Sequence, residues 1–410
     1  MKTIQVGNID TAGARFNGTE LHQQLLNRGI KSQLCVWVKK TNDKNTWRLG
    51  SFVGSRALIF AIKQIEKILS IQSVLYPLSL QFFFDRRFHS ANLVHYHLIH
   101  AGFFSIITLP KLSKMKPTIW TLHDPWAMTG HCIYPLDCVR WKTGCGNCPN
   151  LNTHIPMFID NTRFMWKIKK WVFHNSDIDI VVASKWMLNM AKQSPLLSKT
   201  RVHYIPFGID LDVFNPSDVK KTKLFLGINP DCVVLAFRAT TSEFKGLSYI
   251  RECIKKLNCD KQICLLTIGE KNLFDDFREE YHILDLGWIS ENELPVFYNA
   301  CDIFLMPSTA EAFGVMAIEA MACEKTVVVF EGTSLPEVIF APNGGIAVPQ
   351  GDVDALRRTV ESLINNPEIR QKIGKSALDL VKKNYDADDF MDKMIELYGE
   401  VIKQRREKTN

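Results

Sequence analysis

Two kinds of pattern alternate along this chain. Short apolar runs, rich in β-branched residues and typical of buried parallel strands, are separated by stretches with apolar residues at helical spacing. The runs span 3–6, 32–38, 93–94, 118–122, 179–183 and 202–205 in the first half, and 233–237, 263–268, 283–286, 303–306 and 327–330 in the second. Strand–helix alternation in both halves predicts an α/β protein with two Rossmann-like, doubly wound domains, whose strand ends face a deep cleft.

The polar stretch 212–223 has the composition of a linker between domains. We therefore expect an N-terminal domain over 1–211 and a C-terminal domain over 212–385. The last segment, 386–410, has the spacing of a long amphipathic helix and is expected to pack back toward the N-terminal domain.

The most informative stretch lies between Cys301 and Gly345. It reads as strand, loop, helix and strand, which is one βαβ unit. Glu311 falls just ahead of the predicted helix and Glu319 a turn and a half inside it, so both are expected at the carboxyl edge of the sheet, where open α/β sheets bind ligands. An acid such as Glu319 in an otherwise apolar helix is costly unless it is paired or functional.

Two cations follow the strand 233–237. Arg238 and Lys245 lie on a loop ahead of a helix, an arrangement that suits the binding of a diphosphate. At the other end of the chain, a loop containing Gly13 separates the first strand from the first helix, and its backbone N–H groups could meet a phosphate or a sugar hydroxyl. The GxGxxG pattern of dehydrogenases is absent from this loop.

Composition limits the class of protein. The 410 residues are 46% hydrophobic and 23% charged, with a net charge of +7, which describes a globular protein suited to anionic partners. No apolar run reaches the roughly 18–20 residues of a spanning helix, and the N-terminus enters a strand without a signal peptide. We therefore expect a cytoplasmic protein, and no nucleic acid among its partners.

Two segments combine basic and apolar residues. Residues 51–90 carry Phe, Ile and Leu at helical spacing among lysines and arginines, and 161–173 repeats the theme with Trp166 and Trp171 as candidate interfacial anchors. One interpretation is contact with an anionic membrane. The other is a core-packed helix with one solvated face.

Four histidines follow strands of the first half. His95, His97 and His100 alternate along a strand end, where they either line an acceptor site or pack in the core. His123 follows the strand 118–122 and is a candidate for the ligand pocket or a strand-end residue with internal partners.

Four cysteines lie within a predicted insertion, 131–149. Their spacing is C-x5-C-x6-C-x2-C, and a Cys-x-x-Cys pair is a common half-site for tetrahedral Zn²⁺. The sequence predicts a structural zinc site or, alternatively, reduced or redox-paired thiols. The candidate ligands are Cys132, Cys138, Cys145 and Cys148.

Taken together, these motifs resemble those of the family 4 retaining glycosyltransferases of the GT-B fold, of the type that builds bacterial surface polysaccharides such as O-antigen, capsule and colanic acid. The resemblance covers nearly the whole chain. Its motifs are Arg238 with Lys245-Gly246, Gly287-Trp288-Ile289, Tyr298 to Asp302, Pro307-Ser308, Glu311 to Gly314, Glu319-Ala320, Leu335-Pro336-Glu337 and Gly344-Gly345 in the second half, and His123-Asp124, Ser184 to Trp186 and Ile205 to Asp210 in the first.

The resemblance implies that the domain over 1–211 binds the acceptor and that the domain over 212–385 binds the nucleotide sugar, and it implies roles for these residues. Arg238 and Lys245 would hold the donor diphosphate, Glu311 the donor sugar and Glu319 the ribose. The main-chain amides of Phe313, Gly314 and Val315 would face the phosphates, His123 would line the sugar pocket, and the Gly13 loop would close over the donor. No cofactor or metal is required for catalysis in this family.

Three positions depart from the family pattern. Glu324 stands where glycine is usual, Phe207-Gly208 replaces an Asn-Gly pair, and Ala12-Gly13-Ala14 replaces a Gly-Gly pair. These changes affect local geometry and the choice of sugar more than the reaction.

The expected function is hexosyl transfer from a nucleotide-diphosphate sugar to an undecaprenyl-diphosphate-linked glycan at the inner face of the cytoplasmic membrane. Two alternatives remain: a nucleotide-sugar epimerase of the same architecture, and a catalytically degenerate scaffold subunit.

Overall fold

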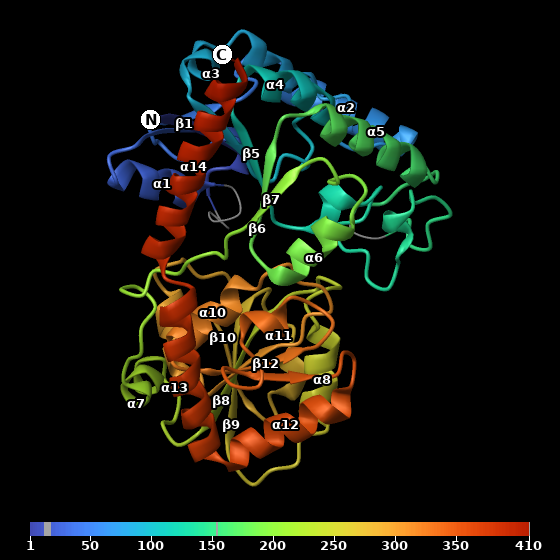
Figure 1. Cartoon of the computed structure of the whole chain (residues 1–410). Helices are drawn as coiled ribbons and strands as arrows, with labels where there is room; N and C mark the ends of the chain where they lie inside the picture. The colour runs from blue at the N-terminus through green and yellow to red at the C-terminus, as the bar shows by residue number, and fades with distance from the viewer. Residues whose placement is uncertain (12–17, 153–154, 410) are drawn as a thin grey trace. The chain divides into compact units, whose positions relative to one another are not determined.

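The protein consists of two compact units, shown in a computed structural model that describes residues 1–11, 18–152 and 155–409 (Figure 1). One unit contains Met1–Ile205 together with Met391–Asn410, and the other contains Pro206–Phe390. Each is built around one parallel sheet, as the alternation of strands and helices predicts.

The first unit contains a seven-stranded sheet in the order β3-β2-β1-β4-β5-β6-β7. Every neighbouring pair is parallel, and β1 and β2 are aligned with Lys2 opposite Lys31. The strands are β1 (Lys2–Ile9), β2 (Lys31–Val38), β3 (Thr46–Arg48), β4 (Leu93–Tyr96), β5 (Thr118–Leu122), β6 (Asp179–Val182) and β7 (Arg201–Tyr204). The helices are α1 (Thr19–Asn27), α2 (Ser55–Leu69), α3 (Arg86–Ser90), α4 (Leu109–Met115), α5 (Thr162–Asn175) and α6 (Lys185–Gln193).

The second unit contains a six-stranded parallel sheet in the order β10-β9-β8-β11-β12-β13. The strands are β8 (Val233–Ala239), β9 (Ile263–Gly269), β10 (His282–Asp285), β11 (Ile303–Met306), β12 (Thr326–Phe330) and β13 (Ile346–Val348). The helices are α7 (Val219–Phe225), α8 (Leu247–Lys255), α9 (Leu294–Ala300), α10 (Val315–Ala322), α11 (Leu335–Val338), α12 (Val353–Asn365) and α13 (Pro367–Asn384).

Helix α12 shows why these segments fold as they do. Its N-cap residue Asp352 accepts a hydrogen bond from the main-chain N–H of Ala355 at 2.8 Å, which satisfies one of the free donors of the first turn. Leu356, Val360 and Leu363 recur at helical spacing and are fully buried. They pack with α8 against one face of the sheet, in the core of the second unit.

The boundary between the units lies at Ile205 and not at residue 211. The segment that follows packs within the second unit, where the main-chain N–H of Ile209 donates to the carbonyl oxygen of Tyr385 at 2.7 Å. A Cβ on Gly208 would lie 2.6 Å from the Cα of Ala387, so only glycine allows this approach. The long C-terminal helix, α14 (Ala387–Thr409), belongs to the first unit from Met391 onward.

The predicted elements agree with the structure except at short strands. The patterns at Thr46–Arg48 and Ile346–Val348 were too short to indicate strands β3 and β13. Both are three-residue strands at the outer edges of their sheets.

Candidate functional site

The candidate site of the second unit lies at the carboxyl ends of β8 and β11. These strands are neighbours in the sheet, and the strand order runs outward from them in opposite directions. Such a switch point is where ligands bind in open α/β sheets. Arg238 stands near the end of β8, Lys245 follows it, and Glu311 follows β11, so the fold brings together residues separated by about 70 positions in sequence.

Lys245 and Glu311 form an ion pair. The Lys245 Nζ lies 2.6 Å from the Glu311 Oε2, and the two side chains are 29% and 12% exposed. The loop that carries Lys245 packs closely against the residue that follows β11. Gly246 lies so near Pro307 that a Cβ on Gly246 would come within 1.9 Å of the carbonyl oxygen of Pro307. The pair holds one cation and one acid at the edge of the sheet, both accessible from solvent.

Arg238 has a different partner. Its guanidinium carbon lies 5.1 Å from the centroid of the Trp288 ring, a cation–π distance, and Trp288 is 72% exposed. The structure therefore places Arg238 beside an exposed aromatic ring that follows β10, and places Lys245 beside Glu311.

The first turn of α10 is open. Gly314 is the N-cap residue with φ 96°, and no described side chain caps the helix. The unbonded N–H groups of a helix N-terminus favour an anion. Phe313 and Val315 bury their side chains, so each can offer only its main-chain amide to a ligand.

Glu319 lies inside the second unit. Its side chain is 4% exposed, and its Oε2 accepts a hydrogen bond from the Tyr298 hydroxyl at 2.5 Å. The buried acid therefore has an internal partner on α9. Its role at the ribose stays a prediction.

His123 belongs to the first unit, where a chain of histidines follows β4 and β5. Its Nε2 lies 3.4 Å from the Nδ1 of His97, whose Nε2 lies 3.0 Å from the Gln5 side-chain oxygen. A Cβ on Gly18, at the start of α1, would lie 2.5 Å from the His97 ring. Gly13 lies outside the described residues. His123 and His97 are thus gathered at the switch point of the first sheet, between β1 and β4.

His95, His97 and His123 are uncharged near neutral pH. His95 is fully buried between Tyr398 and Thr121, each 2.7 Å from a ring nitrogen, and burial lowers the pKa of His95 to about 3. Burial likewise lowers the pKa of His123 to about 3 and that of His97 well below its usual value. His95 and His97 pack in the core, whereas His100 lies 3.1 Å from the Asp124 carboxylate.

The four cysteines of the predicted insertion lie close enough for their thiols to interact electrostatically. Burial, with a smaller contribution from Cys145 and Cys148, raises the pKa of the Cys132 thiol to about 12. All four thiols are free. Within the described ranges, however, no three His, Cys, Asp or Glu side chains form a group that could hold a metal ion, so zinc stays a prediction.

One sequence-based interpretation is wrong in part. Trp166 is 8% exposed and donates its indole N–H to the carbonyl oxygen of Trp141 at 2.9 Å, so it is a core residue and not an interfacial anchor. Trp171, further along the same helix, is 53% exposed.

The sequence also failed to identify two residues with structural importance. Glu270 accepts hydrogen bonds from Thr240 and Thr241 and so ties the loop after β8 to the end of β9. Lys169 is fully buried and donates to the carbonyl oxygens of Trp126 and Thr129. Only the position of Glu270, two residues after a predicted strand, could have indicated its role.

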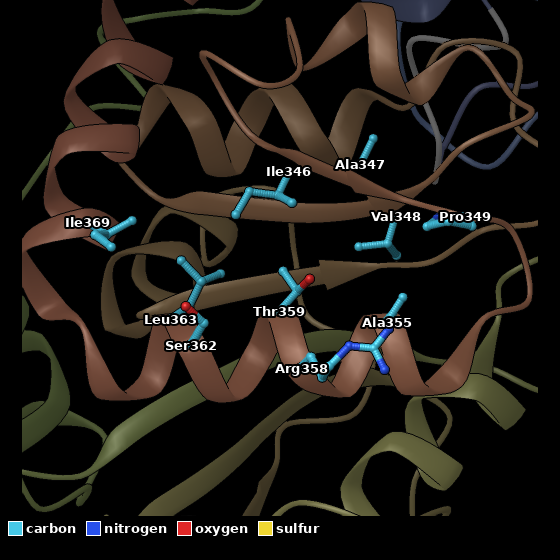
Figure 2. Close-up of a pocket in the computed structure, with 10 residues that line it drawn as sticks. All are labelled: Ile346, Ala347, Val348, Pro349, Ala355, Arg358, Thr359, Ser362, Leu363 and Ile369. Atoms are coloured by element: carbon cyan, nitrogen blue, oxygen red, sulfur yellow. The ribbon is translucent and has the colours of Figure 1, made fainter.

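A separate hollow of about 420 Å³ lies between β13 and α12 (Figure 2). Its lining is mostly apolar, with Arg358 as its one charged side chain. It shares no residue with the switch point and offers no carboxylate to hydrogen-bond sugar hydroxyls. The hollow is therefore not the candidate site.

Two family models match the chain in tandem. "Glycosyltransferase Family 4" matches residues 19–213 and "Glycosyl transferases group 1" matches 219–379. The first match falls almost wholly in the first parallel-sheet unit and the second in the second unit, so the chain carries two domains similar to those of glycosyltransferases, on a GT-B fold.

Individual relatives match only part of the chain. The chain is 34% identical over 88 residues to WcaC of Escherichia coli K12, named for colanic acid biosynthesis, covering 20% of this chain and 22% of the relative. It is 28% identical over 193 residues to the D-inositol 3-phosphate glycosyltransferase of Paenarthrobacter aurescens, covering 43% and 46%. The chain thus spans from about a fifth to about half the length of these two relatives.

Among solved structures, the fold is similar to that of Anabaena HepE in complex with UDP-glucose. The TM-score is 0.67 at 15% identity, over 98% of this chain and all of the other.

Proposed function

We propose that this protein is a retaining glycosyltransferase that moves a sugar from a nucleotide-diphosphate donor to a lipid-linked oligosaccharide in bacterial surface-polysaccharide synthesis. The observation that carries the proposal is the Lys245–Glu311 pair at the switch point of the second sheet. A cation for the diphosphate and an acid for the sugar hydroxyls stand there within 2.6 Å of each other.

The chemistry follows from these groups. The acceptor hydroxyl oxygen forms a bond to the anomeric carbon as the bond from that carbon to the diphosphate breaks, on the same face. The leaving diphosphate takes the hydroxyl proton, so no protein base is needed. Lys245, Arg238 and the open first turn of α10 stabilise the charge that develops on the leaving group.

Two features of the relatives support the finer assignment. WcaC is named for colanic acid biosynthesis, which is a surface polysaccharide. HepE is known in complex with UDP-glucose, which makes this nucleotide sugar the first donor to test. We place the acceptor, an undecaprenyl-diphosphate-linked glycan, at the inner face of the cytoplasmic membrane.

Thermal unfolding in the presence of a panel of nucleotide sugars tests donor binding directly. A donor at about 100 times its Kd should stabilise the folded state by about 2.7 kcal/mol. Lys245→Ala should weaken binding of the donor and of the free nucleoside diphosphate about tenfold or more, because it removes a cation from the phosphates. Glu311→Gln should leave binding of the nucleoside diphosphate nearly unchanged and lower turnover, because it alters a sugar contact.

Lys256→Ala, at an exposed lysine of the second unit, is the matched control and should change neither quantity. NMR of the product reports whether the anomeric configuration is retained. Incubation with donor alone separates the alternative, because an epimerase would convert the donor to an isomer without acceptor. Absence of binding to every nucleotide sugar, with Glu311→Gln indistinguishable from wild type, would sink the proposal.

A further inference from the structure

We propose that helix α2 and the segment that leads into α5 form a docking surface for an anionic lipid bilayer. We call it the α2–α5 surface, and it consists of residues 56–69 and 158–171 where they are exposed. It lies entirely within the first unit.

Helix α2 rests on the first unit by a narrow stripe. Ser55, Ile59 and Glu66 are its buried residues. The opposite stripe, at the same helical spacing, is exposed and has one polar member. Its residues are Ala57, Phe60, Ala61, Gln64 and Ile68. Phe60 is 65% exposed and Ile68 is 64% exposed. A helix that points large apolar side chains at solvent signals a surface that something covers.

The apolar surface continues beyond α2. The Ser70 hydroxyl accepts hydrogen bonds from the main-chain N–H groups of Phe158 and Ile159 at 2.8 and 2.9 Å, which fixes this segment against the end of α2. Both side chains point outward, 68% and 59% exposed. Figure 1 shows α2 and α5 in the same region of the first unit. The exposed apolar residues therefore form one continuous area and not isolated positions.

The exposed charges around this area are mostly positive, and Asp160, partly exposed and hydrogen-bonded to Thr162, is its one acid that is not buried. Arg56, Lys63 and Lys67 of α2 are exposed, whereas its one acid, Glu66, is buried and accepts hydrogen bonds from the main-chain N–H groups of residues 73–75. Helix α5 contains no Asp or Glu, and it adds the exposed Arg163 and Lys167. Apolar side chains bordered by cations are the pattern of helices that lie in the interface of an anionic membrane.

The charge pattern also selects among possible occupants. Two copies of this chain meeting through the same surface would bring together the five exposed cations of each copy with only one partly exposed acid, Asp160, from each, which disfavours a homodimer. An anionic bilayer instead gains about 1 kcal/mol for each Lys or Arg at its surface and buries the apolar side chains. No helix in the described part of the chain is long and apolar enough to cross a membrane.

This inference specifies the surface through which the proposed transferase would reach a lipid-linked acceptor. The identity of the acceptor rests on the proposed function, whereas binding of the protein to a lipid bilayer does not. Vesicle binding can therefore fail while donor binding succeeds, and the reverse.

Vesicle sedimentation tests the proposal with the full chain. Vesicles of phosphatidylcholine containing phosphatidylglycerol are compared with vesicles of phosphatidylcholine alone, at low and high salt. We expect binding to the anionic vesicles, with weakening as salt rises because the cations become screened. Phe60→Ser with Ile68→Ser should lower the partition coefficient about tenfold or more, and Lys63→Glu with Lys67→Glu should do the same.

The matched control is Leu224→Ser with Phe225→Ser, an exposed apolar pair on α7 that is 62% and 79% exposed. It should bind vesicles as the wild type does. Because all the substituted side chains are exposed, circular dichroism and thermal unfolding should match in every variant. Equal vesicle binding by wild type and both α2 variants would overturn the proposal. So would a wild-type dimer in sedimentation velocity that the Phe60 and Ile68 changes dissociate, since a second copy would then be the occupant.

Discussion

At the scale of single residues, Glu324 shows how the backbone geometry of one position governs the choice of side chain. Helix α10 ends in a Schellman motif, in which the main-chain N–H of Glu324 donates to the carbonyl oxygen of Met321 and that of Lys325 to the carbonyl oxygen of Ala320. Glu324 has φ 63°, in the left-handed region. Glycine is preferred at this position in the family because it adopts left-handed φ values without strain, whereas a glutamate there is strained.

We expect Glu324→Gly to stabilise the second unit by about 0.5–1 kcal/mol, because relief of the left-handed strain exceeds the entropy that glycine adds to the unfolded chain. Chemical denaturation measures the difference. Glu324→Ala is the control, since it removes the carboxylate and keeps the Cβ. The explanation fails if the alanine variant gains as much stability as the glycine variant.

At the scale of elements, the turn between β8 and α8 positions Lys245 through a close backbone contact. Gly246 has φ 73° and sits against Pro307, at the end of β11. The two loops that carry Lys245 and Glu311 can therefore pack this closely because Gly246 has no side chain.

Gly246→Ala should destabilise the second unit by about 3 kcal/mol or more, for two reasons. The new Cβ would clash with a backbone oxygen, and an alanine in the left-handed region of φ is itself strained. Gly227→Ala isolates the second contribution, since Gly227 has φ 72° and a Cβ added there would have no atom within 4 Å. This control should lose only about 1–2 kcal/mol. Denaturant titration followed by fluorescence gives both values, and equal losses would contradict the contact with Pro307.

The cysteine insertion is also an element whose state can be measured. Elemental analysis of the purified protein is expected to give one zinc per chain, and Cys148→Ser should lower the content and the melting temperature. Cys259→Ser, at a free thiol outside the insertion, is the control and should keep the metal. A zinc-free wild type whose melting temperature does not change on Cys148→Ser would leave the four cysteines as reduced thiols.

At the scale of the whole molecule, the buried histidines connect the first sheet to the C-terminal helix. His95 bonds to the hydroxyl of Tyr398 on α14, and that hydroxyl also receives a hydrogen bond from the Gln5 side-chain amide at 3.2 Å. Residues at both ends of the chain thus share one buried network within the first unit. The network depends on neutral imidazoles.

Stability of the first unit should fall as the pH drops from about 7 toward 4. The unfolded histidines bind protons near pH 6.5, whereas burial holds the folded pKa of His95 at about 3, so the unfolded state takes up more protons in this window. Each such histidine should cost about 1–2 kcal/mol at pH 5. Denaturation at several pH values measures the slope.

His95→Asn is expected to reduce that slope, while His282→Asn, at an exposed histidine of the second unit, should not. A slope that is the same in wild type and His95→Asn would show that His95 does not contribute to the loss of stability in acid.

The sequence by itself determined the two-unit α/β plan, most strand positions and the residues at the carboxyl edge of the second sheet. Those features depend on local patterns: apolar runs, helical spacing, and glycines or cations at fixed distances from a strand. Even the boundary was only six residues from its observed place, with the difference set by the packing of Ile209 against Tyr385.

Only the tertiary structure decided how those residues are paired. Lys245 meets Glu311 because β8 and β11, which are distant in sequence, are neighbours in the sheet. Arg238 meets Trp288 although β9 lies between β8 and β10, because the segment after β10 bonds to the end of β9 at Gly269. Burial, which depends on the packing of many elements at once, placed Trp166 and Lys169 in the core and left Phe60 and Ile68 exposed. A helical pattern states which residues share a face, but the rest of the fold determines which face is covered.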